Sequence, residues 1–180
     1  LSGLYRYRVP ALIVSRETHP AAVARIFERV NRTGQQLGTF DLMVAKSFTP
    51  KFNLRVKWEE AKERHPVLAA FYGDDGLGPL QVLSLRLHED VRSARVLDLT
   101  AGAIHDNWLH VVEALAGAAD FARDKLGVLE ADWQPYKNLV VVLAAYIMSG
   151  IEPSAREGEL KNWFWSASFS TKYAVGSNTV

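Results

Sequence analysis

Apolar and polar residues alternate first with the period of a strand and then with the period of helices along this chain. Over residues 4–14, apolar positions alternate with basic ones and then form a short apolar run, which Pro10 interrupts. Because proline cannot donate a hydrogen bond to a sheet, this pattern predicts an edge or bent strand. Thr18 and Pro20 mark the start of a helix that is predicted to end near Asn31. Its apolar face has helical spacing and consists of Val23, Ile26, Phe27 and Val30.

Further helices are predicted over residues 39–48, 54–64 and about 80–88, with a loop at 74–79. Thr39 is the expected N-cap of the first of these, and His65-Pro66 is expected to close the charged second one. The longest helix is predicted to start after Thr100 and to end at Gly127. Its apolar stripe consists of Ile104, Trp108, Val111 or Val112, Leu115, Ala119, Ala122 and Leu126.

Residues 139–148 are apolar nearly all round, so a helix that starts at Gln134-Pro135-Tyr136 is expected to be the central buried one. Residues 160–169 are aromatic-rich and predict a short helix, whereas 170–180 are expected to be extended or loose. The pattern as a whole predicts a mainly α protein, a helical bundle with a short N-terminal strand or hairpin.

Composition sets limits on the class of protein. Of the 180 residues, 48% are hydrophobic and 23% are charged, which is typical of a globular chain. The longest apolar run, residues 139–148, is about half of a membrane span, so no membrane partner is expected. The absence of cysteine excludes a disulfide scaffold, a cysteine zinc site and a thiol nucleophile, and fits a cytoplasmic location. Because the chain begins at Leu1 and a regular pattern starts by Leu4, we expect it to be cut from something longer.

The small net charge of +1 hides an asymmetry along the chain. Residues 1–64 carry a net charge of +6 and residues 65–180 a net charge of −5. A basic N-terminal third can raise the local concentration of nucleotides or DNA. A bipolar surface without any ligand explains the same distribution, and both interpretations stay open.

Familiar catalytic motifs are missing. The sequence has no Gly-x-x-x-x-Gly-Lys-Ser/Thr loop, no Gly-x-Gly-x-x-Gly and no Gly-x-Ser-x-Gly. Its five histidines include no i,i+4 pair, so no metal site is predicted, and His105 and His110 are expected to flank the Trp108 stripe. Glu60 and Lys62 have the Glu-x-Lys spacing of some nucleases, but on a charged helix they indicate solvated ion pairing. A self-sufficient hydrolase is therefore not visible.

The segment from Ile26 to Leu37 is the densest in candidate chemistry. Arg25, Arg29 and Arg32 would lie on the side of the helix opposite its apolar face, beside a turn rich in polar residues and glycine. Guanidinium groups match phosphate oxygens, and a glycine lets backbone N–H groups come close to an oxyanion. Cations also offset the dipole at a helix C-terminus, so a purely structural role remains an alternative.

The same segment resembles a known family. Residues 27–37 carry Phe-x-Arg-x-Asn-x-x-Gly-x-x-Leu, followed by Phe40-Asp41-Leu42 and Ala45, which resembles the signature of the GmrSD restriction endonuclease N-terminal-domain family. The preceding apolar strand, Pro135-Tyr136, Trp163-Phe-Trp165 and the segments 170–173 and 176–178 extend the resemblance over nearly the whole chain. The resemblance implies a bacterial or archaeal defence protein with a ParB/sulfiredoxin-like core. On this basis residues 1–50 would be a remnant of that α+β core, and residues 51–180 a helical domain packed on it.

The activity that the resemblance implies is NTP-dependent restriction of modified phage DNA. The family's nucleotide chemistry depends on an Asp-Gly-Gln-Gln-Arg motif, which Gln35-Gln36 does not reproduce, and many members carry a separate His-Asn-His-type nuclease domain. We therefore expect half of an active site here, inactive alone. The fragment itself would hold no cofactor, and the full-length protein would use an NTP, with Mg²⁺ as a further candidate.

Site residues carry over by position in the motif. The candidate nucleotide-binding residues are Arg29, Asn31, Thr33 and Gly34. Arg25 and Arg32 are candidates for phosphate or DNA contact, and Phe27 and Leu37 are expected to be buried supports. No catalytic residue is assigned.

Two other classes of function remain as alternatives to a restriction enzyme. The chain could be a non-catalytic helical interaction module or a DNA-binding domain that uses its basic third. The C-terminal aromatic residues could stack bases beside Lys161 and Lys172, or they could belong to the core or to an interface. The expected partners are the remainder of the parent chain, DNA and a second copy of this chain.

Overall fold

The computed structural model describes residues 37–134, 136 and 138–170. It divides the chain into two units, Leu1–Gln36 and Leu37–Val180, so the described residues belong to the second unit. Over these residues the secondary structure is helical and includes no strand, which confirms the prediction of a mainly α bundle. The strand predicted over 4–14 and the helix predicted over 20–31 lie outside the described residues.

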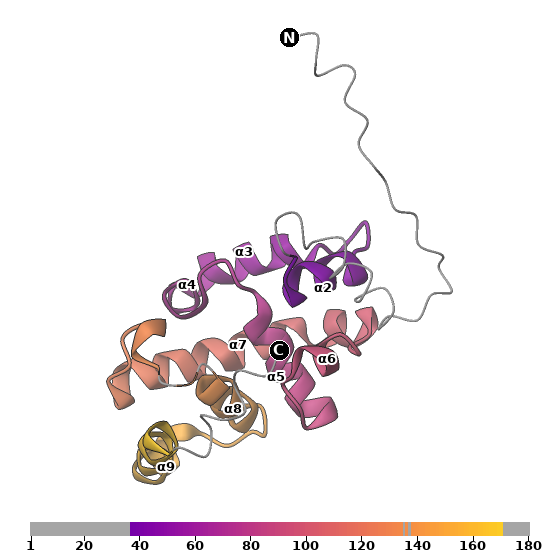
Figure 1. Cartoon of the computed structure of the whole chain (residues 1–180). Coiled ribbons are helices and arrows are strands. Elements are labelled where there is room, and N and C mark those ends of the chain that lie inside the picture. The colour runs from indigo at the N-terminus through magenta and orange to yellow at the C-terminus, as the bar shows by residue number, and fades with distance from the viewer. Residues whose placement is uncertain (1–36, 135, 137, 171–180) are drawn as a thin grey trace. The chain divides into compact units, whose positions relative to one another are not determined.

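Eight α-helices follow one another in the described part of the second unit (Figure 1). Their bounds are α2 Thr39–Ser47, α3 Leu54–Arg64, α4 Pro66–Tyr72, α5 Leu77–His88, α6 Ser93–Val96, α7 Ala101–Phe121, α8 Asn138–Ile147 and α9 Glu157–Phe169. A π-helical turn, Ala122–Leu126, extends α7, and short 3-10 helices precede α8 and α9.

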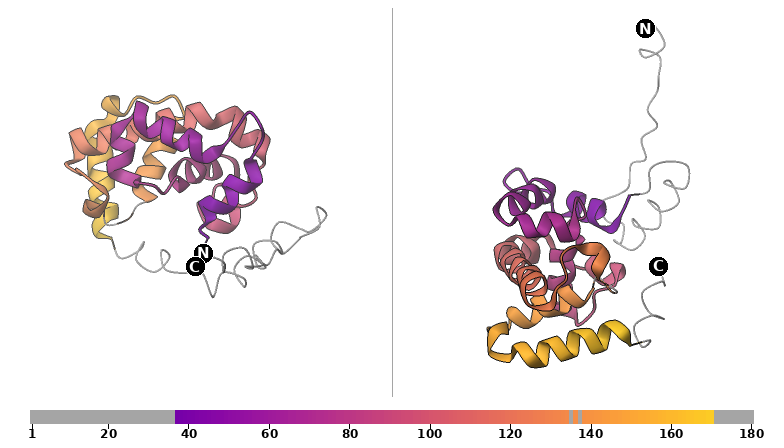
Figure 2. Two further views of the ribbon diagram at one scale, coloured as in Figure 1. Left: turned by 90° about the horizontal axis from the view of Figure 1, so that it is seen from above. Right: turned by 90° about the vertical axis from the view of Figure 1, so that its left-hand side faces the viewer.

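Three helices, α5, α7 and α8, pack against one another at the centre of this unit. Helices α2, α3 and α4 cover one side of α7, and α9 lies on the opposite side, beyond α8, as the views of Figures 1 and 2 agree. The core is continuous across these layers, from Phe40 on α2 to Phe164 on α9. The domain boundary predicted at residue 50 falls inside this unit, between α2 and α3.

Helix α7 forms as its sequence predicts. The Thr100 hydroxyl accepts a hydrogen bond from the Ala103 N–H at 3.2 Å, which satisfies a backbone donor at the helix start. Every member of the predicted apolar stripe, from Ile104 to Leu126, is buried. Gly127 ends the π-helical turn with a φ of +75°, a conformation that glycine adopts without a steric penalty.

Helix α8 is the expected buried helix. It packs against both α5 and α7, and Leu139, Val140, Val141, Leu143 and Ala144 are all buried. Because two neighbours cover it, apolar residues all round the helix are favourable over most of its circumference.

Two local predictions are wrong, and the helix that starts at Pro66 was not predicted. The N-cap of α2 is Gly38 rather than Thr39, because the Asp41 side chain reaches back to the Gly38 N–H at 2.9 Å. His65-Pro66 closes α3 as expected, but Pro66 also starts α4, since proline is well suited to the first position of a helix. Helix α5 begins at Leu77, within the predicted loop, where the Asp75 carboxylate accepts a hydrogen bond from the Leu77 N–H at 3.1 Å.

Among the described helices, none combines the length and the apolar character that crossing a bilayer requires.

Candidate functional site

Most of the predicted nucleotide site lies outside the described residues. This applies to Arg29, Asn31, Thr33 and Gly34, and equally to the remaining candidates Arg25, Arg32 and Phe27. Leu37 is described, and its exposed fraction is 44%. The expectation that Leu37 is a buried support stays a prediction, because the residues that precede it lie outside the described part of the chain.

Phe40 and Asp41, which follow the predicted nucleotide-binding residues along the chain, lie on the first turn of α2. Phe40 is buried, and its ring lies directly against Gly76, where an added Cβ would come within 2.4 Å of the ring. The Arg55 guanidinium lies 5.4 Å from the centroid of the same ring and forms an ion pair with Asp41. Asp41 also holds the Gly38 N–H, so this carboxylate ties the start of α2 to α3.

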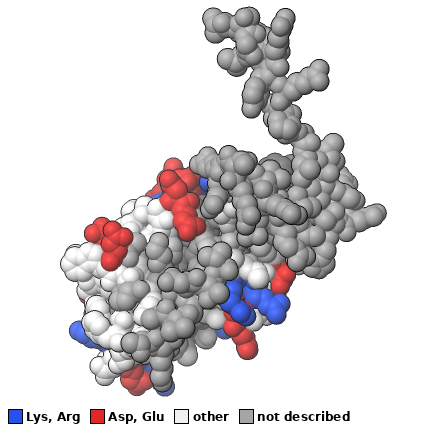
Figure 3. Space-filling model, viewed as in Figure 1, with Lys and Arg blue, Asp and Glu red and all other residues white. Residues whose placement is uncertain are grey.

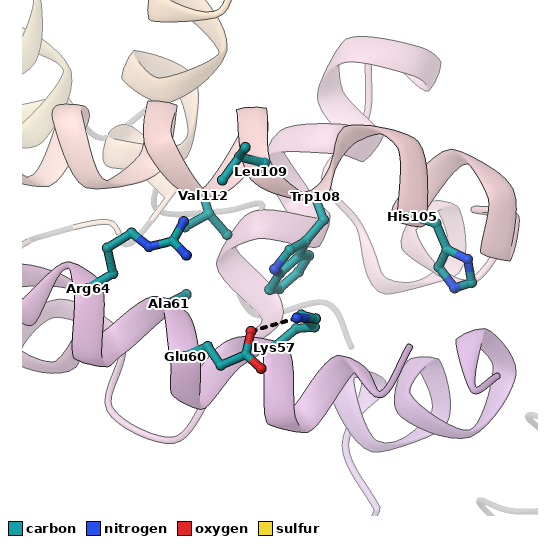
Figure 4. Close-up of a pocket in the computed structure, with 8 residues that line it drawn as sticks. All are labelled: Lys57, Glu60, Ala61, Arg64, His105, Trp108, Leu109 and Val112. Carbon is teal, nitrogen blue, oxygen red and sulfur yellow. Dashed lines mark hydrogen bonds and ion pairs between the residues drawn. The ribbon is translucent and has the colours of Figure 1, made fainter. Parts of the chain in front are cut away.

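A groove between α3 and α7 brings ionisable and aromatic side chains together (Figure 4). Its volume is about 210 Å³. The lining residues come from two faces, Lys57, Glu60, Ala61 and Arg64 on α3 and His105, Trp108, Leu109 and Val112 on α7. The spacing i, i+3, i+4, i+7 on α3 places its four residues on one helical face.

The charged wall of the groove is α3. The Lys57 ammonium pairs with the Glu60 carboxylate at 2.6 Å. Arg64 is exposed and forms no ion pair with any residue that the structure describes. Figure 4 shows its guanidinium group directed into the groove beside Val112.

The apolar wall of the groove is α7. Trp108 is only 8% exposed, and Phe52 contacts it edge-on with ring centroids 6.3 Å apart. Leu109 is 49% exposed and leaves apolar surface open beside the indole ring. The groove therefore places an aromatic surface, Trp108, next to the Arg64 guanidinium, which has no acidic partner among the described residues.

His105 closes one end of the groove. Its Nε2 lies 2.9 Å from the Ser47 carbonyl oxygen, and its ring centroid lies 4.0 Å from that of Phe52. Because a carbonyl oxygen only accepts, His105 Nε2 carries the hydrogen and donates. The imidazole thus ties α7 to the end of α2. In the described part of the chain, no three histidine, aspartate or glutamate side chains are grouped as metal ligands.

The Glu-x-Lys pair on α3 has the solvated ion pairing expected from the sequence. Glu60 pairs with Lys57, whereas Lys62 pairs with Glu59 at 3.0 Å and with Asp74 at 2.9 Å. The hydrogen bond to Asp74 raises the pKa of Lys62, and the same contact lowers the pKa of Asp74. The carboxylate and the ammonium of this motif therefore serve separate partners.

The aromatic side chains of α9 differ in their burial, so the interpretation of this segment as core holds for only some of them. Phe164 is completely buried, and Trp163 and Trp165 are half-buried against the core. Phe169 is 79% exposed and stacks on Trp165, with ring centroids 5.8 Å apart. The core interpretation therefore holds for Phe164 and not for Phe169.

Charge on the described surface is dispersed. On the face shown in Figure 3, basic and acidic side chains lie in small separate groups among uncharged residues. That view of the described residues shows no continuous basic surface.

Comparison with known proteins gives one relative to report. The chain aligns over 187 residues with an uncharacterized protein of Methanocaldococcus jannaschii, at 29% identity, over 97% of this chain and 32% of the relative. The chain thus spans about a third of the length of the relative that it matches. No family model matches the chain, and no solved structure matches it.

Proposed function

We propose that this chain contributes a nucleotide-binding segment, residues 25–37, and a helical support to a cytoplasmic prokaryotic defence protein. In this proposal the whole protein resembles NTP-dependent, modification-dependent DNA restriction enzymes. Arg29 would pair with phosphate oxygens, Asn31 would fix the turn or a ligand hydroxyl, and Gly34 would let backbone donors approach the ligand. The single observation that carries the proposal is the ordered signature of residues 27–37 with its continuation at Phe40 and Asp41.

The geometry of α2 supports the proposal. Phe40 is packed against Gly76 and Arg55, and Asp41 is bonded to both Gly38 and Arg55. Phe40 and Asp41 therefore each make contacts that fix the first turn of α2.

Nucleotide binding by the Arg29→Ala variant tests the proposal. We expect Arg29→Ala to weaken binding of a fluorescent ATP analogue at least tenfold, because it removes a charged hydrogen-bond donor from phosphate. The melting temperature should stay within a few degrees of that of the unmodified chain. Arg86→Ala is the matched control, since it removes one exposed arginine from α5 and should leave binding unchanged.

Two outcomes would contradict the assignment. One is an Arg29→Ala variant that binds the analogue as tightly as the unmodified chain. The other is a variant whose far-UV circular dichroism shows that it no longer folds, because Arg29 would then be a structural residue. Asn31→Ala, measured in parallel, should weaken binding without loss of helicity.

A second candidate function, a non-catalytic interaction module, is favoured by one observation. Phe169 exposes most of its ring at the end of α9 although it stacks on Trp165. An exposed aromatic side chain such as Phe169 is typical of a contact surface. If this surface joins two copies of the chain, light scattering should detect a dimer that Phe169→Ser abolishes. DNA retention that falls steeply with salt, and is lost when Arg25, Arg29 and Arg32 are replaced, would instead indicate a DNA-binding domain.

A further inference from the structure

We propose that the groove between α3 and α7 binds a small organic anion, an aromatic ring that carries a carboxylate or phosphate group, with the oxyanion on Arg64 and the ring against Trp108 and Leu109. None of the residues that line this groove belongs to the segment 25–37, and the proposal does not depend on the proposed nucleotide-binding function.

The ion pairs on α3 explain why the Arg64 guanidinium can bind a ligand. Glu60 lies four residues before Arg64, at a spacing where a glutamate and an arginine commonly pair on a helix. In the structure the Glu60 carboxylate pairs instead with Lys57 at 2.6 Å. Lys57 therefore neutralises the one carboxylate in the lining and leaves the Arg64 guanidinium without a protein acceptor among the described residues.

The chemistry of Arg64 selects an oxyanion. A guanidinium group presents a planar set of N–H donors that fits the paired oxygens of a carboxylate or phosphate. Figure 4 shows this group directed into the groove rather than out along the end of α3. Its charge also offsets the dipole at the C-terminus of α3, but that role affects stability and not ligand binding.

The α7 wall of the groove favours a ligand with an apolar, planar group. Trp108 presents its indole to the groove and is held edge-on by Phe52, so the surface is fixed before a ligand arrives. Leu109 and Val112 extend the apolar wall, and Leu109 is half exposed. A ring placed there would cover apolar surface that water now contacts, and a ring against an indole gains a further favourable contact.

The volume sets the size of the ligand. At about 210 Å³ the groove is smaller than the cavities that hold drug-sized ligands, which are roughly 300–1,000 Å³. A single ring with one oxyanion group suits this space better than a dinucleotide does.

The experiment uses the full chain, labelled with ¹⁵N, and four probes. Benzoate and phenyl phosphate are the ring-bearing anions, benzyl alcohol is the uncharged ring and inorganic phosphate is the oxyanion alone. We expect benzoate, phenyl phosphate or both to shift the Trp108 indole N–H resonance, assigned from Trp108→Phe, in a saturable way below about 10 mM. Benzyl alcohol and inorganic phosphate should each bind at least tenfold more weakly, because each offers only half of the contacts.

Variants on α3 separate this site from non-specific anion binding. Arg64→Ala should weaken binding at least tenfold, and Arg64→Lys should weaken it less, because the charge remains but the planar fork does not. Glu60→Gln should strengthen binding, whereas Glu63→Gln, which removes a charge from α3 outside the groove, should not. Lys57→Ala should weaken binding, because it frees Glu60 to pair with Arg64.

The results of the probes also separate the two kinds of ligand. Saturable binding of benzoate alone indicates a carboxylate ligand, and binding of phenyl phosphate alone indicates a phosphate ester. The proposal is overturned if neither probe shifts the Trp108 resonance, or if a folded Arg64→Ala variant binds as the unmodified chain does. Equal effects of Glu60→Gln and Glu63→Gln would also overturn it, since the site would then respond only to overall charge.

Discussion

The contact between Phe40 and Gly76 can be tested by adding one carbon atom. In Gly76→Ala, the new Cβ would lie 2.4 Å from Cζ, 2.5 Å from Cε2 and 3.0 Å from Cε1 of the Phe40 ring. Carbon atoms in proteins are normally about 3.5–4.0 Å apart, so the ring must move by about 1 Å. The backbone at Gly76 has a φ of −77° and a ψ of 21°, which alanine also adopts without backbone strain. Gly76 is also the N-cap of α5, where alanine is less favourable than glycine, so the packing part of the cost is isolated by the double-mutant cycle below.

The structure leaves the ring little room to move. Phe40 is 6% exposed, and the Arg55 guanidinium lies over its face. Overpacking of this kind costs about 1–3 kcal/mol, so we expect Gly76→Ala to lower the free energy of unfolding by that amount. The measurement is urea denaturation followed by circular dichroism. Gly102→Ala is the matched control, because nothing lies within 4 Å of its added Cβ, and it should not destabilise the chain.

A double-mutant cycle identifies the cause. Phe40→Ala alone should cost about 3–5 kcal/mol, since it empties a buried site. In that background Gly76→Ala should keep only its cost at the N-cap, because the ring that it would strike is gone, which gives a coupling energy of about 1–3 kcal/mol. If Gly76→Ala is as stable as the unmodified chain, or if the two changes are additive, the packing of α2 against the start of α5 is not as described.

Two further predictions concern single polar contacts. Thr100→Ala should lower the free energy of unfolding by about 1 kcal/mol in urea denaturation, because the Ala103 N–H loses its cap, and Thr100→Asp should restore most of the loss. The pKa of Asp90 is lowered to about 2, chiefly by its hydrogen bonds from Arg92. Since the pKa of an unfolded aspartate is about 3.9, this carboxylate stabilises the fold above that pH and loses its effect as the pH falls towards 2. The stability difference between Asp90→Asn and the unmodified chain should therefore shrink from pH 4 to pH 2, and a constant difference would contradict the assignment.

The helices could be predicted from the sequence because their signals are local. The apolar stripe from Ile104 to Leu126 repeats with the helical period, and the residues at both ends, Thr100 and Gly127, act through backbone groups a few positions away. The start of α4 and the true cap of α2 were missed for a related reason. Pro66 can end one helix or begin another, and Asp41 can replace a hydroxyl cap from inside the helix.

The candidate groove could not have been found from the sequence. Its two walls, Lys57 to Arg64 and His105 to Val112, are separated along the chain and meet only because α3 packs near α7. The sequence does show an arginine on a charged helix and a tryptophan on an apolar stripe. It does not show that Glu60 pairs with Lys57, and this choice of partner leaves Arg64 available.

By itself, then, the sequence determined the existence of the longer described helices, the end of α3 and the buried residues of α7 and α8. Those properties depend on hydrogen bonds within one helix and on the periodicity of apolar side chains. Only the tertiary structure decided that Phe40 lies against Gly76, that Phe164 is buried while Phe169 is exposed, and that Arg64 faces Trp108 across a groove. These depend on which helices pack together, because contacts between distant segments are set by the shape and charge of both partners at once.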